Sequence, residues 1–215
     1  MPRLPTLTLP LSLSRSLILT LTLALLAPAA FAAPAPAPAP APAPGLKAGV
    51  FNPPRAAPEI SLSSSNGGQF KLSDYRGKVV VLEFGFTHCV EVCPVSLATL
   101  TQARQAMGAA AADVQVVFVT VDPARDSVAR MRSYLSPFDK SFIGVTGTRQ
   151  QVDAVLKAYG ITTTKRMVEG SKRDYTMHHS SYLYFIDRHG MQRAMMPFGR
   201  ASSDFVHDLH LLLKQ

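Results

Sequence analysis

The chain of 215 residues has no tryptophan and only two cysteines, Cys89 and Cys93, separated by three residues. Secreted domains that depend on disulfides for stability are rich in cysteine, so a disulfide-stapled scaffold is excluded. A bridge between two such close neighbours would close a very small loop and constrain the unfolded chain little. The pair is therefore predicted to have a chemical role.

Acidic residues are also scarce: 14 aspartates and glutamates face 22 lysines and arginines, which gives a net charge of +8. The basic residues are scattered, and only Lys165-Arg166 and Lys172-Arg173 form small clusters. There is no basic stripe interleaved with aromatic residues, so nucleic acid is not a predicted partner. A basic surface favours approach to an anionic membrane or to an acidic protein.

Long apolar runs are absent except near the N-terminus. Arginines precede the apolar stretch Leu17 to Ala30, and Ala30-Phe31-Ala32 then offers small residues to a signal peptidase. Residues 1–32 are therefore predicted to be a signal peptide. The alternative is an uncleaved anchor, although the run is short for a membrane span and contains Pro28. In either case the protein is expected to be exported and periplasmic, soluble or tethered to the inner membrane by its N-terminus.

Proline is concentrated in one place, because Ala33 to Pro44 strictly alternates alanine and proline. Proline fixes φ and lacks a backbone donor, so this stretch cannot join a helix or a core. Residues 33–55 are predicted to be an Ala/Pro-rich linker, either a semi-rigid spacer or low-complexity filler. Residues 56–215 remain, which suits one domain with its own core.

Hydrophobic periodicity and turn residues predict the elements of this domain. Short strands at 59–62 and 69–72 flank Asn66-Gly67-Gly68. They are followed by a strand at 78–86, a helix from Pro94 to Met107, a strand at 114–121, a helix capped by Asp126 or Ser127, a strand at 142–145, a helix capped by Thr148, strands at 181–187 and 191–197, and a helix from Ser202. Residues 162–176 lack periodicity and are predicted to be an exposed loop or hairpin. The order predicts a thioredoxin-like three-layer α/β/α fold with a central mixed sheet.

In this layout Cys89 and Cys93 lie at the carboxyl edge of the sheet, where a strand ends and a helix begins. Open α/β folds place ligands at this edge. The positive helix N-terminus is expected to favour the thiolate form of both cysteines. Thiolates either exchange with disulfides or bind soft metals, and the location alone leaves both chemistries open.

A third group comes from His178-His179, which precede the predicted strand 181–187. That strand is expected to run antiparallel beside the central strand, so its start lies at the cysteine edge. Two sulfurs and one imidazole suit copper in either oxidation state, and zinc could use the same ligands with water. Because neighbours on an extended segment point to opposite sides, only one of the two histidines is expected to face the cysteines. No proline stands at 178–181, where thioredoxin-like disulfide exchangers usually carry a cis-proline, so metal binding is favoured.

Three separated motifs resemble the SCO/SenC family over about residues 56–213: Gly85-Phe86-Thr87-His88-Cys89 with Cys93-Pro94, Val119 to Asp126, and Gly144 to Thr148, with His179 before a tyrosine-rich strand. The resemblance implies a copper-binding protein of thioredoxin-like fold that delivers copper to the dinuclear copper centre of cytochrome c oxidase, or assists its thiols. Carried over by position, the copper ligands are Cys89, Cys93 and His179. The family commonly has an aspartate where this chain has His178, which puts the orientation of the ligand histidine in question.

The leading hypothesis is therefore a copper metallochaperone rather than an enzyme, with a copper-accepting oxidase subunit or another copper chaperone as partner. We expect it to act as a monomer. The alternative is a thiol–disulfide oxidoreductase, in which Cys89 and Cys93 are catalytic and form a disulfide when oxidised. A thiol peroxidase is a weaker third reading, because the expected upstream proline is missing. Asp122 is predicted to fix the loop after its strand by hydrogen bonding.

Overall fold

The computed structural model describes residues 45–215. The predicted signal peptide or anchor and the Ala-Pro alternation lie outside these residues. In the described part of the chain, no helix is both long enough and apolar enough to cross a membrane.

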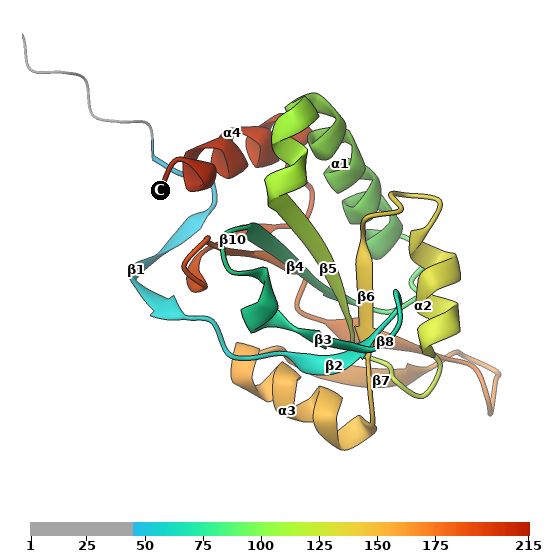
Figure 1. The fold of residues 1–215 in the computed structure, drawn as a ribbon. Helices are drawn as coiled ribbons and strands as arrows, with labels where there is room; N and C mark the ends of the chain where they lie inside the picture. Colours follow the sequence, from blue (N-terminus) through green and yellow to red (C-terminus); the bar gives the residue numbers. More distant parts are fainter. Residues whose placement is uncertain (1–44) are drawn as a thin grey trace, which may run out of the picture. The chain divides into compact units, whose positions relative to one another are not determined.

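The domain is built on an eight-stranded mixed sheet with the order β1-β10-β9-β4-β5-β6-β2-β3 (Figure 1). Its strands are β1 (Gly49–Ala56), β2 (Ser61–Ser64), β3 (Gln69–Lys71), β4 (Val79–Gly85), β5 (Val114–Thr120), β6 (Ile143–Thr146), β9 (Tyr182–Ile186) and β10 (Met191–Pro197). The central strands β4, β5 and β6 are parallel, and the other pairs are antiparallel. Every residue of β4 and β5 is buried, as expected for parallel strands that are covered on both faces.

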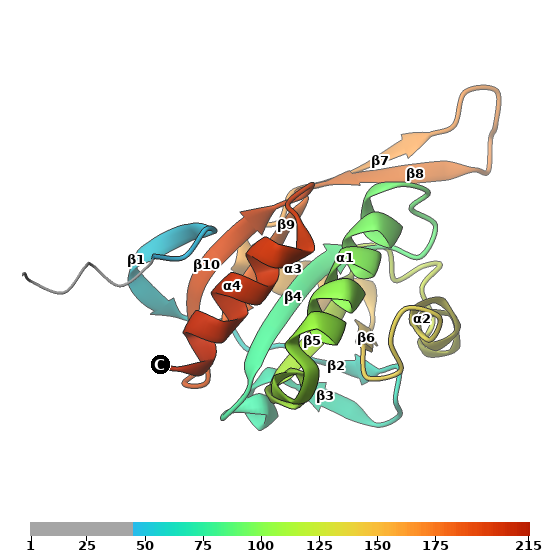
Figure 2. The same cartoon turned by 90° about the horizontal axis from the view of Figure 1, so that it is seen from above.

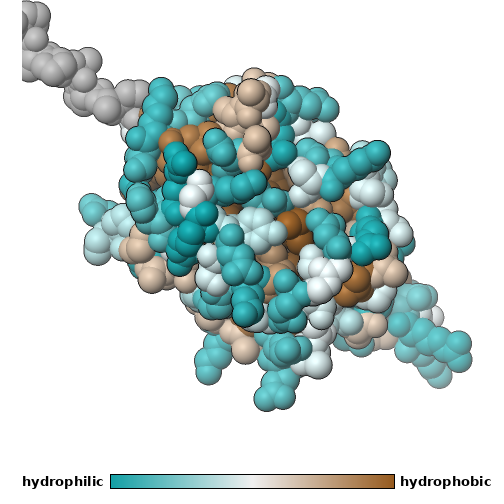
Figure 3. Space-filling view, in the orientation of Figure 1, coloured by the Kyte–Doolittle hydropathy of each residue, from teal (hydrophilic) through white to brown (hydrophobic). Residues whose placement is uncertain are grey.

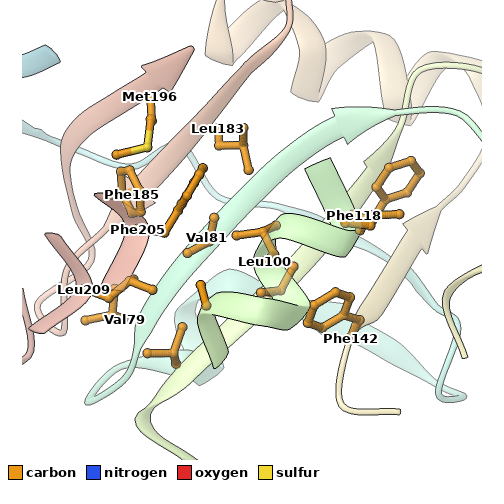
Figure 4. Packing of buried hydrophobic residues seen from close by; sticks show 14 of the residues in the cluster. Val79, Val81, Leu100, Phe118, Phe142, Leu183, Phe185, Met196, Phe205 and Leu209 are labelled. Carbon is orange, nitrogen blue, oxygen red and sulfur yellow. The ribbon is translucent and has the colours of Figure 1, made fainter. Parts of the chain in front are cut away.

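Helices cover both faces of this sheet (Figure 1). The helices α1 (Val92–Met107), α2 (Val128–Leu135) and α4 (Ser202–Leu213) share one hydrophobic core, and α3 (Arg149–Tyr159) packs into a second core on the other face. Figure 4 shows the first core, where Phe185 and Phe205 lie near Leu209, and Leu100 of α1 faces Val81 of β4. The face of the domain seen in Figure 3 is largely hydrophilic, with small apolar areas. The predicted three layers and mixed sheet are confirmed.

The helix starts follow the predicted capping chemistry with two adjustments. Thr148 caps α3 through a capping box with Gln151, as its sequence predicts. Ser127, and not Asp126, caps α2, because the carboxylate of Asp126 is used elsewhere. The first helix begins at Val92 rather than at Pro94, so that Cys93 is the second residue of α1. Short 3-10 turns at Leu72–Tyr75 and Gly108–Asp113 complete the connections.

The predicted linker boundary at residue 55 is wrong, because β1 is part of the sheet. Gly49 pairs with Met195 and Ala56 pairs with Met191 of β10. Just before β1, the backbone N–H groups of Lys47 and Ala48 donate to the Asp208 carboxylate of α4, both at 2.8 Å. Strand β1 could not be recognised in the sequence, because the residues it pairs with lie far along the chain and its prolines interrupt any strand pattern.

The stretch predicted to be a loop or hairpin is a hairpin, formed by β7 (Thr163–Met167) and β8 (Tyr175–His179). Its two strands form a separate sheet, and Figure 2 shows the hairpin projecting from the rest of the domain. Alternation along β8 places Met177 in the core, with 6% of its surface exposed, while His178 is exposed to solvent. Because the period of a strand is two, His179 points to the same side as Met177, toward the domain.

Candidate metal centre

The two cysteines lie where β4 leaves the sheet and α1 begins. Cys93 is fully buried, and its backbone N–H donates to Cys89 Sγ at 3.4 Å. Gly85, the last residue of β4, makes this approach possible. A Cβ atom on Gly85 would stand 2.8 Å from Cys93 Sγ and 2.6 Å from the Phe118 ring. Only glycine fits between the strand and the first turn of α1.

The two thiols differ strongly in acidity. The pKa of Cys89 is lowered to about 5, chiefly because the Cys93 thiol donates a hydrogen bond to its sulfur. Burial opposes this shift. Hydrogen bonds from the backbone N–H groups of Cys93 and Glu91, and the positive charge of a protonated His179, lower the pKa further. The same shared hydrogen bond, together with burial, raises the pKa of Cys93. The expectation that the helix N-terminus makes both sulfurs thiolate is therefore wrong for Cys93. The two sulfurs share one proton, which stays on Cys93, and the surrounding hydrogen-bond donors stabilise the thiolate of Cys89.

His179, the last residue of β8, faces the cysteine loop. Its ring meets the Phe86 ring edge-on, with centroids 6.0 Å apart. Its Nδ1 lies 2.9 Å from the carbonyl oxygen of Ser180. A carbonyl only accepts, so Nδ1 carries a proton, and in the neutral imidazole the Nε2 lone pair is then left for a metal. The Ser180 carbonyl thus orients the ring of His179.

Glu83 is a residue of this site that the sequence analysis missed. It stands in β4, two residues before Gly85, and only 4% of its surface is exposed. Within residues 45–215 its Oε2 has no hydrogen-bond partner. Burial, followed by the negative charge of Cys89, raises the pKa of Glu83 well above its usual range, against a hydrogen bond from Ser96. A small cavity is lined by Glu83, Ser96 and His179 among other residues. The signal that could have found it is a lone charge in an otherwise apolar strand.

Buried polar contacts hold the start of the cysteine loop. Asp126, which has no exposed surface, accepts hydrogen bonds from Thr87 Oγ1 and Thr120 Oγ1, each at 2.7 Å, and from the Thr87 N–H at 3.2 Å. Arg130 Nε donates to Thr87 Oγ1 at 2.9 Å. Asp122 fixes the loop after β5 as predicted: its backbone carbonyl accepts from the N–H groups of Arg125 and Asp126, and its carboxylate accepts from Arg125 Nε.

The structure brings Cys89 and Cys93 into contact and places His179 close enough for its charge to act on Cys89. In residues 45–215, no three side chains of histidine, cysteine, aspartate or glutamate already stand close enough together to hold a metal ion. Both cysteines are free thiols in this structure. A thiolate, a thiol and an imidazole nitrogen fit a soft metal such as copper, since thiolate and imidazole are its preferred protein ligands.

Fold and site together define a thioredoxin-like domain in which two cysteines and one histidine lie at the same edge of the central sheet. Residues 52–214 match the model of the SCO1/SenC family, and the chain belongs to that family. The structure of ScoI from Bradyrhizobium japonicum with copper bound is similar, with a TM-score of 0.68 and 32% identity over 73% of this chain and 99% of that one. Yeast Sco1 with copper bound is similar with a TM-score of 0.67 and 29% identity over 75% of this chain and 90% of that one. The thioredoxin-like fold and the family resemblance are confirmed.

Among curated proteins, an SCO2-like protein of Rickettsia felis is 32% identical over 132 residues. That match covers 61% of this chain and 64% of the relative, so the chain spans slightly less than two thirds of its length.

Proposed function

We propose that this protein binds one copper ion through Cys89, Cys93 and His179 and supplies it during assembly of cytochrome c oxidase. The observation that carries the proposal is the free Nε2 of His179, held on the side of β8 that faces a thiolate and its partner thiol. Copper-bound relatives of the same fold support the choice of metal. Copper is the cargo in this proposal, and transfer proceeds by ligand exchange.

The residues suggest how loading and release would work. Cys89 offers a thiolate at neutral pH, because its pKa is about 5. Cys93 must lose its proton to become a second thiolate ligand, since metals bind the deprotonated sulfur. A disulfide between the two would leave no thiolate for copper, so loading requires the reduced pair. The recipient is an oxidase subunit that accepts copper or another copper chaperone, and the protein works as a periplasmic monomer, soluble or tethered by its N-terminus.

The chain offers a matched pair of variants, His179→Ala and His178→Ala. The two histidines are adjacent on β8, but only His179 faces the cysteines. We expect His178→Ala to bind Cu(II) like the parent. His179→Ala should lose Cu(II) affinity by roughly 100-fold or more while keeping two titratable thiols, because loss of a group that merely supports a ligand already costs about 10–100-fold. Competition with a chelator and the electron paramagnetic resonance spectrum of Cu(II) measure both. Equal affinities for the two variants would contradict the proposal.

A second candidate function, thiol–disulfide exchange with a partner protein, rests on the acidity of Cys89. A thiolate nucleophile beside a buried thiol is the arrangement needed to attack a disulfide and then resolve the mixed disulfide. This activity does not need the imidazole of His179. Reduction of a model disulfide at the parent rate by His179→Ala, together with rescue of an oxidase-assembly defect by that variant, would favour exchange over copper delivery.

A further inference from the structure

Within residues 45–215, the hairpin that carries His179 is not held by the main sheet, because β7 and β8 pair only with each other there. The position of the imidazole relative to the cysteines therefore depends on how the hairpin is attached to the domain. One side chain of the domain, Arg125, makes several contacts with the first residue of β8. Arg125 lies in the turn after β5, and its motif neighbour Asp122 lies two residues beyond the end of that strand.

Arg125, Asp122 and Tyr175 form a closed set of contacts, which we call the latch. Arg125 Nε donates to Asp122 Oδ2 at 2.5 Å, and Arg125 Nη1 donates to the Tyr175 carbonyl oxygen at 2.8 Å. The guanidinium carbon lies 3.6 Å from the centroid of the Tyr175 ring. The Tyr175 hydroxyl donates to the remaining carboxylate oxygen of Asp122 at 3.0 Å. The latch thus joins β8 to the domain through its backbone, its ring and its hydroxyl.

The latch is connected to the metal centre at two points. Tyr175 begins β8 and His179 ends it, so the two lie roughly 14 Å apart along one extended strand. Phe86, three residues before Cys89, packs edge-on against His179 and lies 5.8 Å from the guanidinium carbon of Arg125. The Asp122 side chain is only 3% exposed and that of Arg125 22%, so these charge-assisted hydrogen bonds are largely shielded from water.

We propose that Arg125 is a positioning residue for copper retention, which holds the hairpin so that His179 stays against the cysteines. The inference rests on the proposed function and adds a residue that touches neither the sulfurs nor the imidazole. The planar, forked guanidinium of Arg125 donates hydrogen bonds to the Asp122 carboxylate and to the Tyr175 carbonyl oxygen at the same time, and its face stacks on the Tyr175 ring. Lysine keeps the charge but has neither the fork nor the flat face.

The test compares Arg125→Lys and Tyr175→Phe with a matched control, Arg104→Lys. Arg104 is also a half-buried arginine, whose Nε donates to Asp139 at 3.0 Å, but it lies near the far end of α1. Cu(II)-loaded proteins are mixed with excess EDTA, and the rate of copper loss is followed with the Cu(II) resonance spectrum. Hydrogen exchange of amides 175–179 is measured on the copper-free proteins.

We expect Arg125→Lys to lose copper roughly tenfold faster than the parent, with a changed Cu(II) spectrum, because a support of a ligand has been removed. Tyr175→Phe should show a smaller change, since only the hydroxyl contact is lost. Exchange within 175–179 should accelerate in Arg125→Lys. Arg104→Lys should lose thermal stability while copper loss and hairpin exchange stay at the parent values.

Parent rates of copper loss and of exchange in Arg125→Lys would overturn the inference. So would equal acceleration in Arg125→Lys and Arg104→Lys, which would mark a general loss of stability. If the parent protein itself failed to bind copper, the proposed function would fall. The exchange measurement on the copper-free proteins would still decide whether the latch holds the hairpin.

Discussion

Gly85 is the point where α1 approaches the sheet most closely, and Gly85→Ala tests the geometry there. The added Cβ would stand 2.6 and 2.7 Å from two carbons of the Phe118 ring and 2.8 Å from Cys93 Sγ. Contacts below 3.0 Å force atoms apart, and both neighbours are fully buried. Overpacked cores lose about 1–3 kcal/mol, so we expect a loss of about 2 kcal/mol in the free energy of unfolding.

Urea unfolding measures this loss. With an m-value of about 2 kcal/mol per M, a loss of about 2 kcal/mol lowers the midpoint by about 1 M. Gly144→Ala is a matched control, because its Cβ would stand 2.9 Å from Leu135 Cδ1 and 2.9 Å from Met131 Cβ, away from the cysteines. It should lose similar stability. Only Gly85→Ala displaces the sulfur of Cys93, so only this variant should raise the pKa of Cys89.

Two outcomes would refute this reasoning. A midpoint for Gly85→Ala within about 0.3 M of the parent would mean that the strand and helix tolerate a methyl group between them. An equal rise of the Cys89 pKa in Gly144→Ala would mean that general loosening, and not displacement of Cys93, controls the thiolate. Gly49→Ala supplies a baseline, because its Cβ would meet only the Met195 carbonyl oxygen at 3.6 Å.

Two further predictions concern charge at the site. Cys93→Ala should raise the pKa of Cys89 from about 5 toward the ordinary thiol value of 9.0, because the thiol that donates to Cys89 is lost; the pH dependence of alkylation by iodoacetamide measures it. A midpoint that stayed near 5 would show that the backbone donors suffice. Glu83→Gln should gain stability relative to the parent between pH 5 and pH 8. The pKa of Glu83 is raised in the folded protein above its ordinary value of 4.5. As the pH rises above 4.5, the unfolded chain releases a proton from Glu83 that the folded protein still keeps. The free energy of unfolding of the parent therefore falls as the pH rises, whereas that of Glu83→Gln does not. Urea midpoints at both pH values test this, and a constant difference would contradict it.

The elements set by local patterns could be predicted from the sequence. The bounds of β10 and the first residue of α4 match those predicted, and Thr148 caps α3 because its capping box with Gln151 is local. β1 could not be predicted, since the strand it pairs with, β10, lies more than 130 positions further along the chain and no local periodicity marks it.

The candidate site shows the same division. Strand alternation was enough to predict that only one of His178 and His179 faces the cysteines. The unequal acidity of Cys89 and Cys93 was beyond the sequence, because it depends on one shared hydrogen bond. The contacts that form the latch around Arg125 could not be predicted from the sequence either. Arg125 and Tyr175 are separated by 50 positions, and only the folded chain stacks one on the other.

The prolines of β1 have a consequence for association between copies. β1 is an outermost strand of the eight-stranded sheet, and Pro53 and Pro54 lie where its register breaks, between Val50 and Arg55. A proline has no N–H to offer, and an irregular edge cannot serve as a template for a foreign strand. At the opposite edge β3 has only three residues. Both edges of this sheet are therefore poor templates for strand-to-strand aggregation of the folded domain.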